Sequence, residues 1–120
     1  MKSNGADMMQ TAVADDVFYA LSNATRRKIL EQLSVGPATV SDLAAPFEMK
    51  LPSFVQHLTV LERSRLVKSK KLGRVRTYEI SPEQFRVVED WLGEQRKLWE
   101  SRFDRFDEYV KQLKEKESKS

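Results

Sequence analysis

The spacing of apolar residues changes between Leu66 and Ile80, and this change restricts the fold more than any other feature of the sequence. On either side of this segment, apolar residues recur every three to four positions, which is typical of amphipathic helices. Inside it they alternate roughly every second residue on both sides of residues 72–74, which predicts two strands and a tight turn with Gly73 at a positive φ. A chain with this pattern is expected to be mainly α-helical with one small β-hairpin.

Start and stop signals divide the helical part into five helices, the first of which begins near Asp15. Asn23 is a typical N-cap for a second helix over residues 24–33, and Thr39 with Asp42 has the spacing of a capping box for a short third helix. The fourth helix covers about residues 51–64. Its apolar stripe predicts a buried face made of Leu51, Phe54, Leu58 and Leu61.

The last helix is expected to start at Ser81-Pro82 and to continue to about residue 115. At ~1.5 Å per residue its length is ~50 Å, which is more than a domain of this size can cover. Part of its apolar stripe must therefore face another chain. This part of the predicted dimer interface consists of Trp91, Leu92, Leu98, Trp99, Phe103, Phe106 and Val110.

The net charge of +3 conceals an uneven distribution. Residues 50–81 contain eight Lys or Arg side chains against Glu62 and Glu79, so this stretch carries +6, whereas residues 1–49 sum to −2 and residues 82–120 to −1. A cationic segment of this kind attracts polyanions, although a solvated basic face is the alternative. The outer face of the fourth helix is poor in acidic residues. Together with this cationic segment and the order of the elements, that face predicts a winged helix-turn-helix that binds double-stranded DNA.

We expect four parts along the chain. Residues 1–14 form a flexible N-terminal segment, residues 15–81 the DNA-binding domain, residues 82–115 a dimerisation helix and residues 116–120 a mobile tail.

Composition argues against several classes of protein. The chain has no cysteine and one histidine, so disulfide scaffolds, thiolate metal sites and multi-histidine sites within one chain are excluded. No apolar run approaches the ~18 residues of a membrane span, and residues 1–10 lack the apolar centre of a signal peptide, so we expect a cytoplasmic protein. No glycine-rich phosphate loop, nucleophile–base pair or paired-carboxylate cleft is visible. We therefore expect no enzymatic activity, no metal and no cofactor.

Several stretches of the sequence, taken in order, resemble the ArsR/SmtB family of bacterial transcriptional regulators. They are ALSNATRRKIL over residues 20–30, Gly36-Pro37 with VSDLA over 40–44, Leu51-Pro52 with HLTVLE over 57–62, and Leu66-Val67, Gly73-Arg74 and Tyr78. The aromatic residues after Trp91 resemble the branch of the family with a long last helix. The resemblance implies a homodimeric regulator, expected to be a repressor, that binds an inverted-repeat operator. It also implies that the first helix joins the dimer interface, through Val17, Phe18 and Leu21.

We expect DNA contacts from the fourth helix and the hairpin. Gln56 is expected to contact adenine in the major groove, with plain solvent exposure as the alternative, and Val55 is expected to touch a thymine methyl group. At Lys50 and Val55 the family often has small hydroxyl residues, so base preference cannot be copied from relatives. For His57 both a DNA-proximal and a structural role stay open. The predicted DNA-binding residues are Lys50, Ser53, Val55, Gln56, His57, Thr59, Arg63, Lys68, Lys70, Arg74 and Arg76.

Three further interpretations accompany this prediction. At least one of Arg26, Arg27 and Lys28 is expected to reach a DNA phosphate or an acidic partner residue. The family's metal ligands are cysteines on the third helix or Asp/His sets on the last helix; neither set is present, so the chain resembles a metal-independent member. The rival function is a protein-interaction dimer that kept the fold and lost DNA binding, and the rival to a dimer core on the last helix is a ligand pocket between its aromatic side chains.

Overall fold

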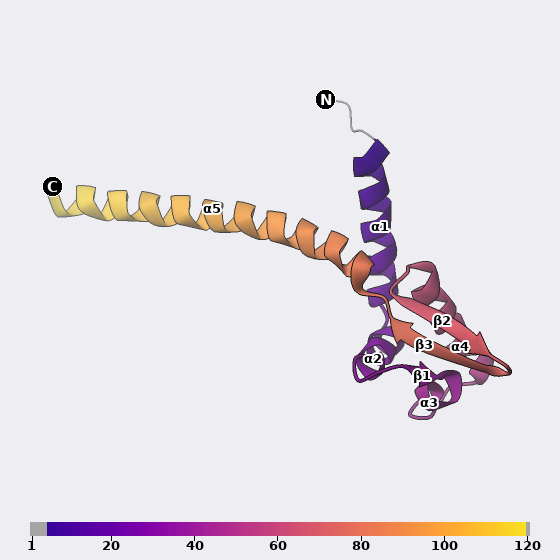
Figure 1. Ribbon diagram of the computed structural model, residues 1–120. Helices are drawn as coiled ribbons and strands as arrows, with labels where there is room; N and C mark the ends of the chain where they lie inside the picture. Colours follow the sequence, from indigo (N-terminus) through magenta and orange to yellow (C-terminus); the bar gives the residue numbers. More distant parts are fainter. Residues whose placement is uncertain (1–4, 120) are drawn as a thin grey trace. The chain divides into compact units, whose positions relative to one another are not determined.

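The computed structural model describes the backbone of residues 5–119 and the side chains of residues 11–118. Its elements are α1 (Gly5–Leu21), α2 (Ala24–Leu33), β1 (Ala38–Thr39), α3 (Val40–Ala44), α4 (Leu51–Arg63), β2 (Val67–Leu72), β3 (Val75–Ile80), the 3-10 helix η1 (Pro82–Gln84) and α5 (Phe85–Lys119) (Figure 1). The chain forms two compact units, residues 1–88 and 89–120, and each is described by itself. The predicted class, a mainly helical chain with the element order of a winged helix-turn-helix, is confirmed.

The predicted caps set the starts of two helices. The side chain of Asn23 accepts the backbone N–H of Arg26 at 3.1 Å, and the Thr39 hydroxyl accepts that of Asp42 at 3.2 Å. The outer helices are longer than expected, because α1 begins at Gly5 and α5 continues to Lys119. Residues 6–14 have little periodicity but contain three Ala, two Met and one Gln, which are residue types of high helix propensity. Residues 1–4 and 120 of the expected flexible segment and tail lie outside the described residues.

The hairpin is joined by a third strand that the sequence did not predict. Gly73 has a φ of +62° at the turn, as expected. β1 pairs antiparallel with β3, with Ala38 opposite Tyr78 and Thr39 opposite Thr77, so the strand order is β1-β3-β2. A strand of two residues is too short to show alternation, which is why it was missed. The pairing of β1 with β3 fixes the hairpin to the rest of the unit at the end that lies away from the turn.

The core of the first unit lies between its helices and the base of the sheet. Phe54, Leu58 and Leu61 of α4 are fully buried, as predicted, and each contributes ~1.5–3 kcal/mol of burial free energy. The prediction for Leu51 is wrong, since its side chain is 55% exposed. Leu51 begins α4 one turn before Phe54 and lies beyond the buried cluster. That cluster contains Ala14, Val17, Ala20, Ile29, Leu30, Leu33, Leu43, Phe54, Leu58, Leu61, Leu66, Val67, Tyr78 and Val88.

A sharp turn after α4 leads directly into β2. The N–H of Leu66 donates to the carbonyl of Leu61 at 3.1 Å, and the N–H of Arg65 donates to that of Glu62 at 3.0 Å, which is a Schellman motif. Arg65 occupies the left-handed position with a φ of +61°, where glycine is usual. The motif places the hairpin beside the C-terminal end of α4.

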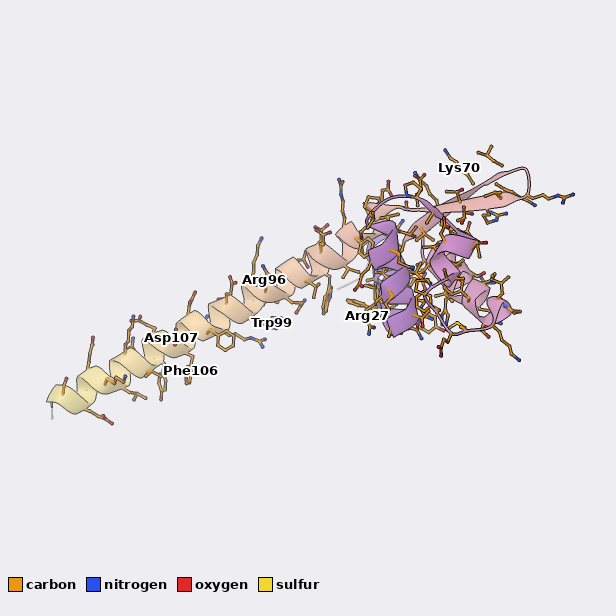
Figure 2. All side chains as sticks on the ribbon, turned by 90° about the horizontal axis from the view of Figure 1, so that it is seen from below. Arg27, Lys70, Arg96, Trp99, Phe106 and Asp107 are labelled. Atoms are coloured by element: carbon orange, nitrogen blue, oxygen red, sulfur yellow. The ribbon has the colours of Figure 1, made fainter. Side chains whose placement is uncertain are left out.

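The second unit consists of the helix α5 from Glu89 onward. Figure 2 shows Trp99 and Phe106 on one side of this helix, with Arg96 and Asp107 together on another side. In the described part of the chain, no helix has the length and apolar character needed to cross a bilayer.

Candidate nucleic-acid interface

The outer face of α4 presents polar side chains to solvent. Ser53, Gln56 and Thr59 are exposed there, and Val55 is 38% exposed beside them. The Thr59 hydroxyl donates to the carbonyl of Val55 at 3.0 Å, so it keeps only acceptor capacity for a ligand. The Gln56 amide forms no hydrogen bond with another described residue. It therefore retains both the donor and the acceptor that adenine recognition requires.

Both ends of this face carry a cation. Lys50 is the N-cap residue of α4, but its side chain makes no capping hydrogen bond, so its ammonium group is not used by the helix. Arg63 lies exposed in the last turn. With the free N–H groups of the first turn, Lys50 makes the start of α4 positive. The face is therefore polar in the middle and cationic at both ends.

The two acidic side chains of the basic segment are both engaged within it. Glu62 accepts a hydrogen bond from the Ser69 hydroxyl at 2.8 Å, and Ser69 in turn accepts one from the Arg76 guanidinium at 2.8 Å. Glu79 lies 3.6 Å from the ammonium of Lys68 in an exposed ion pair. Lys68 and Arg76 thus have partners in the chain, whereas Lys70 and Arg74 form no ion pair with the described residues.

The wing, defined as residues 67–80 of the hairpin, concentrates like charges. Lys71 lies directly opposite Arg76 in the β2–β3 register, an arrangement that is unfavourable without a counter-ion. Lys70 is one position further along, opposite Thr77, and projects from the wing in Figure 2. At the tip, Leu72 is 80% exposed. The pairing of cations across the wing favours an anionic partner.

A buried network connects α1, α2 and α4 behind this face. Arg26 is 6% exposed; its Nε donates to the carbonyl of Ala20 at 2.7 Å, and its Nη2 donates to that of Tyr19 at 2.9 Å. Its Nη1 lies 3.2 Å from Nδ1 of His57, and its guanidinium lies 5.1 Å from the centre of the Tyr19 ring. Since arginine only donates, His57 accepts at Nδ1 and carries its proton on Nε2. Burial and then the Arg26 charge lower the pKa of His57 below its ordinary value of 6.5.

These contacts engage Arg26 within the chain, so the predicted contact with a phosphate or an acidic residue stays a prediction for Arg27 and Lys28. They also support the structural role of His57. Arg26 reaches two backbone carbonyls and a histidine, not a phosphate or an acid. The link between α1 and α2 is only two residues long, which brings the free carbonyls at the end of α1 within reach of Arg26. The short link between the two helices was therefore the sequence feature that could have predicted the internal contacts of Arg26. Arg27 donates to the carbonyl of Leu21 at 2.7 Å on the surface, and Lys28 lines a pocket.

The predicted dimer residues are divided between the two units. Val17 is fully buried in the core of its own unit, so the prediction that it faces a partner is wrong. Phe18 is 41% exposed and Leu21 half-buried on α1. On α5, Val110 is half-buried, and the other predicted residues are exposed, namely Trp91, Leu92, Leu98, Trp99, Phe103 and Phe106.

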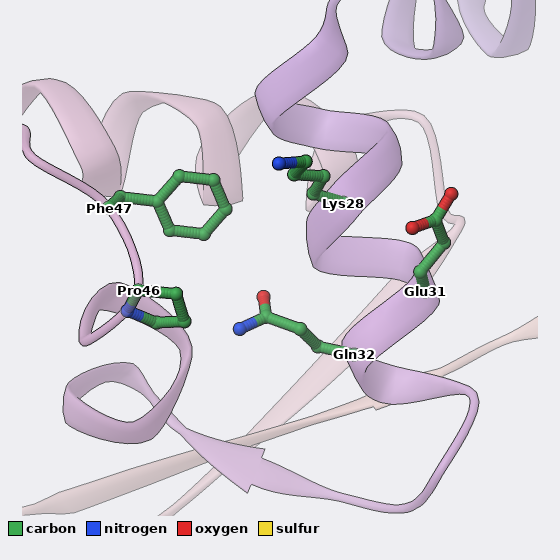
Figure 3. Close-up of a pocket in the computed structure, with 5 residues that line it drawn as sticks. All are labelled: Lys28, Glu31, Gln32, Pro46 and Phe47. Atoms are coloured by element: carbon green, nitrogen blue, oxygen red, sulfur yellow. The ribbon is translucent and has the colours of Figure 1, made fainter.

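One pocket of about 360 Å³ lies away from the α4 face, between α2 and the turn after α3. Figure 3 shows its lining residues, Lys28, Glu31, Gln32, Pro46 and Phe47. The Gln32 amide donates to the carbonyl of Leu43 at 3.3 Å, while its Oε1 is buried without a partner among the described residues. No nucleophile is placed against a base in this lining. In the part of the chain that the structure describes, no group of three His, Cys, Asp or Glu side chains is placed to hold a metal ion.

Known proteins share both the sequence and the fold of the first unit. Residues 21–70 match a helix-turn-helix domain family. The chain is 40% identical over 68 residues to the HTH-type transcriptional regulator Rv2034 of Mycobacterium tuberculosis, a match that covers 57% of this chain and 64% of that protein. It is 31% identical over 78 residues to the transcriptional repressor SdpR of Bacillus subtilis, covering 65% of this chain and 87% of the repressor.

A solved structure extends the comparison to most of the chain. The crystal structure of the ArsR family transcriptional regulator RHA00566 is 52% identical and superimposes with a TM-score of 0.73. The superposition covers 76% of this chain and 94% of that one. Together with the winged helix-turn-helix order and the basic wing beside α4, these matches show that the chain belongs to the ArsR family of transcriptional regulators.

Proposed function

We propose that the chain is a homodimeric repressor that binds an inverted-repeat operator in double-stranded DNA and has no enzymatic activity. In this proposal α4 enters the major groove, and the wing contacts phosphates of the neighbouring backbone. The exposed apolar faces of α5 and α1 form the dimer surface. The similarity to the transcriptional repressor SdpR favours repression over activation.

The observation that carries this proposal is the distribution of charge around α4. The segment 50–81 has a net charge of +6, and its two carboxylates are already engaged by Ser69 and Lys68. The remaining cations surround an α4 face that carries a free amide and a methyl surface. A pure adaptor protein has no need for this arrangement, whereas a DNA-binding surface uses phosphate contacts for affinity and base contacts for specificity.

Individual residues take different roles in this proposal. Gln56 is the base-reading side chain, in a bidentate contact to adenine, and Val55 is the surface for a thymine methyl group. Lys50 and Arg63 hold the two ends of α4 on the backbone. Ser53 and Thr59 add neutral contacts, Thr59 only as an acceptor. His57 has a structural role, since its contact with Arg26 connects α4 to α2 on the side of α4 away from the DNA. Lys68, Lys70, Arg74 and Arg76 form the phosphate contacts of the wing.

The test is a gel-shift titration of the purified protein against genomic fragments at several salt concentrations. Arg74→Ala is expected to weaken binding to all fragments about equally and to lower the slope of log K against log salt by about 1. Lys97→Ala, a cation of α5 outside the basic segment, is the matched control and should leave the slope unchanged. Equal slopes for Arg74→Ala and the unaltered protein would contradict the wing contact.

Specificity is tested by selecting binding sites from random DNA. Gln56→Ala is expected to lose preference at one base position in each half-site, at a cost of about 1–3 kcal/mol if the contact is bidentate. The return of the unaltered motif would exclude Gln56 as the base reader. If no fragment binds more tightly than bulk DNA at any salt concentration, the protein-interaction dimer is the better function.

A further inference from the structure

The pocket between α2 and the turn after α3 contains a polar atom that the chain itself does not use. The pocket has a volume of about 360 Å³ and lies within the first unit. Gln32 lines it and is held in place by a hydrogen bond from its Nε2 to the carbonyl of Leu43, at 3.3 Å. The Oε1 of the same amide is buried and accepts no hydrogen bond from a described residue. A buried acceptor is costly unless a donor reaches it.

The hydrogen bond to Leu43 also determines which end of the amide faces the pocket. With the amide reversed, its oxygen would meet the carbonyl of Leu43, and two acceptors would lie together without a proton between them. The nitrogen therefore belongs on the Leu43 side. Figure 3 shows the Gln32 oxygen turned towards the space between Lys28 and Phe47. The pocket thus offers an acceptor to a ligand that brings an N–H or O–H donor.

The other lining residues define the rest of the ligand. Phe47 is half-buried, and Pro46 lies next to it, so one wall of the pocket is apolar. Lys28 is exposed, and its ammonium group forms no ion pair with a described residue. Glu31 is also exposed at the rim, and Figure 3 shows its carboxylate turned away from Phe47. The charge that faces the apolar wall is therefore positive.

We propose that this pocket binds a small aromatic carboxylate that also carries an N–H or O–H donor, such as a hydroxybenzoate. The ring packs against Phe47 and Pro46, the carboxylate meets the ammonium of Lys28, and the donor reaches Oε1 of Gln32. A volume of about 360 Å³ is at the small end for ligand pockets, which suits a molecule with one ring. A second carboxylate near the rim would be repelled by Glu31, so we expect a monoanion.

Phe47 connects this pocket to the helix that is proposed to read DNA. Its ring centre lies 5.4 Å from that of Phe54, a fully buried residue of α4. A ligand that packs against Phe47 therefore acts on the position of α4. Its carboxylate also cancels a positive charge, that of Lys28, in the unit that must attract DNA. We expect the ligand to lower operator affinity, and this effect alone rests on the function proposed above.

Binding to the pocket is measured on the full-length protein without DNA, by nuclear magnetic resonance titration of the isotope-labelled chain. The probes are the three hydroxybenzoate isomers, because they place the hydroxyl group at different distances from the carboxylate. We expect at least one isomer to bind with a Kd of about 1 mM, since a molecule of about ten non-hydrogen atoms binds weakly. The amide signals of Gln32, Leu43 and Phe47 should shift and saturate.

Two outcomes of this titration would overturn the proposal. A pocket that holds only water would give no saturable shift with any isomer up to about 10 mM. Saturable shifts confined to α5 would place the ligand between the aromatic side chains of that helix instead.

Two analogues test the polar contacts separately. Benzoate lacks the hydroxyl group and should bind about tenfold more weakly than the matching hydroxybenzoate, because Oε1 of Gln32 loses its donor. Hydroxybenzamide has no charge and should also bind about tenfold more weakly, because the contact with Lys28 is lost.

Matched variants should remove each of these differences. In Gln32→Met the side chain keeps its length but has no amide oxygen, so hydroxybenzoate and benzoate should bind equally. In Lys28→Gln the acid and the amide should bind equally. Each test compares two ligands on one protein, so a change in stability affects both alike. Arg27→Gln, on the same helix but outside the lining, is the control and should keep both differences. A difference that persists in Gln32→Met or Lys28→Gln would refute that contact.

A gel shift with and without the bound isomer tests the effect on DNA. We expect the operator affinity of the unaltered protein to fall about fivefold, and that of Gln32→Met to change less than about twofold at the same ligand concentration. Binding to the pocket with unchanged operator affinity would overturn the effect on α4. A protein that binds no DNA fragment specifically would refute the proposed function, whereas the titration without DNA still decides the pocket, so the two failures are distinguishable.

Discussion

Replacement of Arg26 tests whether the first unit depends on one buried guanidinium. Arg26→Ala removes a buried, charge-assisted hydrogen bond to the carbonyl of Ala20, worth about 1.5–3 kcal/mol. The loss at Tyr19 is smaller, because its carbonyl also accepts from the backbone N–H and the hydroxyl of Ser22. His57 loses its donor, at about 1 kcal/mol. We expect the free energy of unfolding to fall by about 3–4 kcal/mol in total.

The measurement must report on the first unit by itself. Both tryptophans, Trp91 and Trp99, lie on α5 in the second unit, so tryptophan fluorescence is not a probe placed within residues 1–88. Hydrogen exchange at the buried amides of Leu58 and Leu61 on α4 measures that stability directly.

Three control variants separate the sources of the effect. Arg26→Met keeps the apolar stem and should recover about 1 kcal/mol. Arg26→Lys keeps the charge but cannot make three directed contacts, so it should still lose about 2 kcal/mol. Arg27→Ala, which removes one surface contact, should cost less than about 1 kcal/mol. A loss below about 1 kcal/mol for Arg26→Ala, or full stability for Arg26→Lys, would refute the argument from geometry.

The remaining predictions concern pH, the turn after α4, and metals. Because the pKa of His57 is lowered on folding, the unfolded chain binds the proton more readily, so stability should be full above about pH 6.5 and decline as the pH falls below it. His57→Asn should flatten this part of a urea-unfolding profile, and an unchanged profile would argue against the assignment. Arg65→Gly should raise the free energy of unfolding by about 0.5–1 kcal/mol because it relieves a positive φ, whereas Arg65→Ala should not. Zinc, nickel, arsenite and EDTA should leave operator affinity unchanged; a tenfold shift with a stoichiometric ion would contradict this.

Local signals in the sequence were sufficient for most elements of the first unit. Caps at Asn23 and Thr39 and the turn at Gly73 each depend on a residue type whose side chain or backbone suits one position. The structure confirms all three. The strand β1 could not be predicted in this way, because its two residues are defined only by their partners Thr77 and Tyr78, far away in the sequence.

The candidate site shows the same limit for charged residues. A cation in the sequence does not reveal whether its partner will be water, a phosphate or the chain itself. Arg26 was grouped with Arg27 as a possible phosphate contact, but tertiary packing turned it towards two carbonyls of α1. The positions of Lys70 and Arg76 on the wing were predictable from the hairpin. The hydrogen bonds from Arg76 to Ser69 and from Ser69 to Glu62 could not be predicted from the sequence, because they depend on how the hairpin packs beside α4.

Periodicity locates an apolar face, but it does not identify what covers that face. Phe54 and Leu58 on α4 and Trp99 and Phe106 on α5 follow the same helical spacing. In one chain the first two are fully buried and the last two are 48% and 62% exposed. The difference arises because elements close in sequence pack over α4, whereas α5 from Glu89 onward forms a unit of its own. Helical spacing is therefore enough to predict that a face is apolar, whereas the segment that covers the face depends on contacts between residues far apart in the sequence.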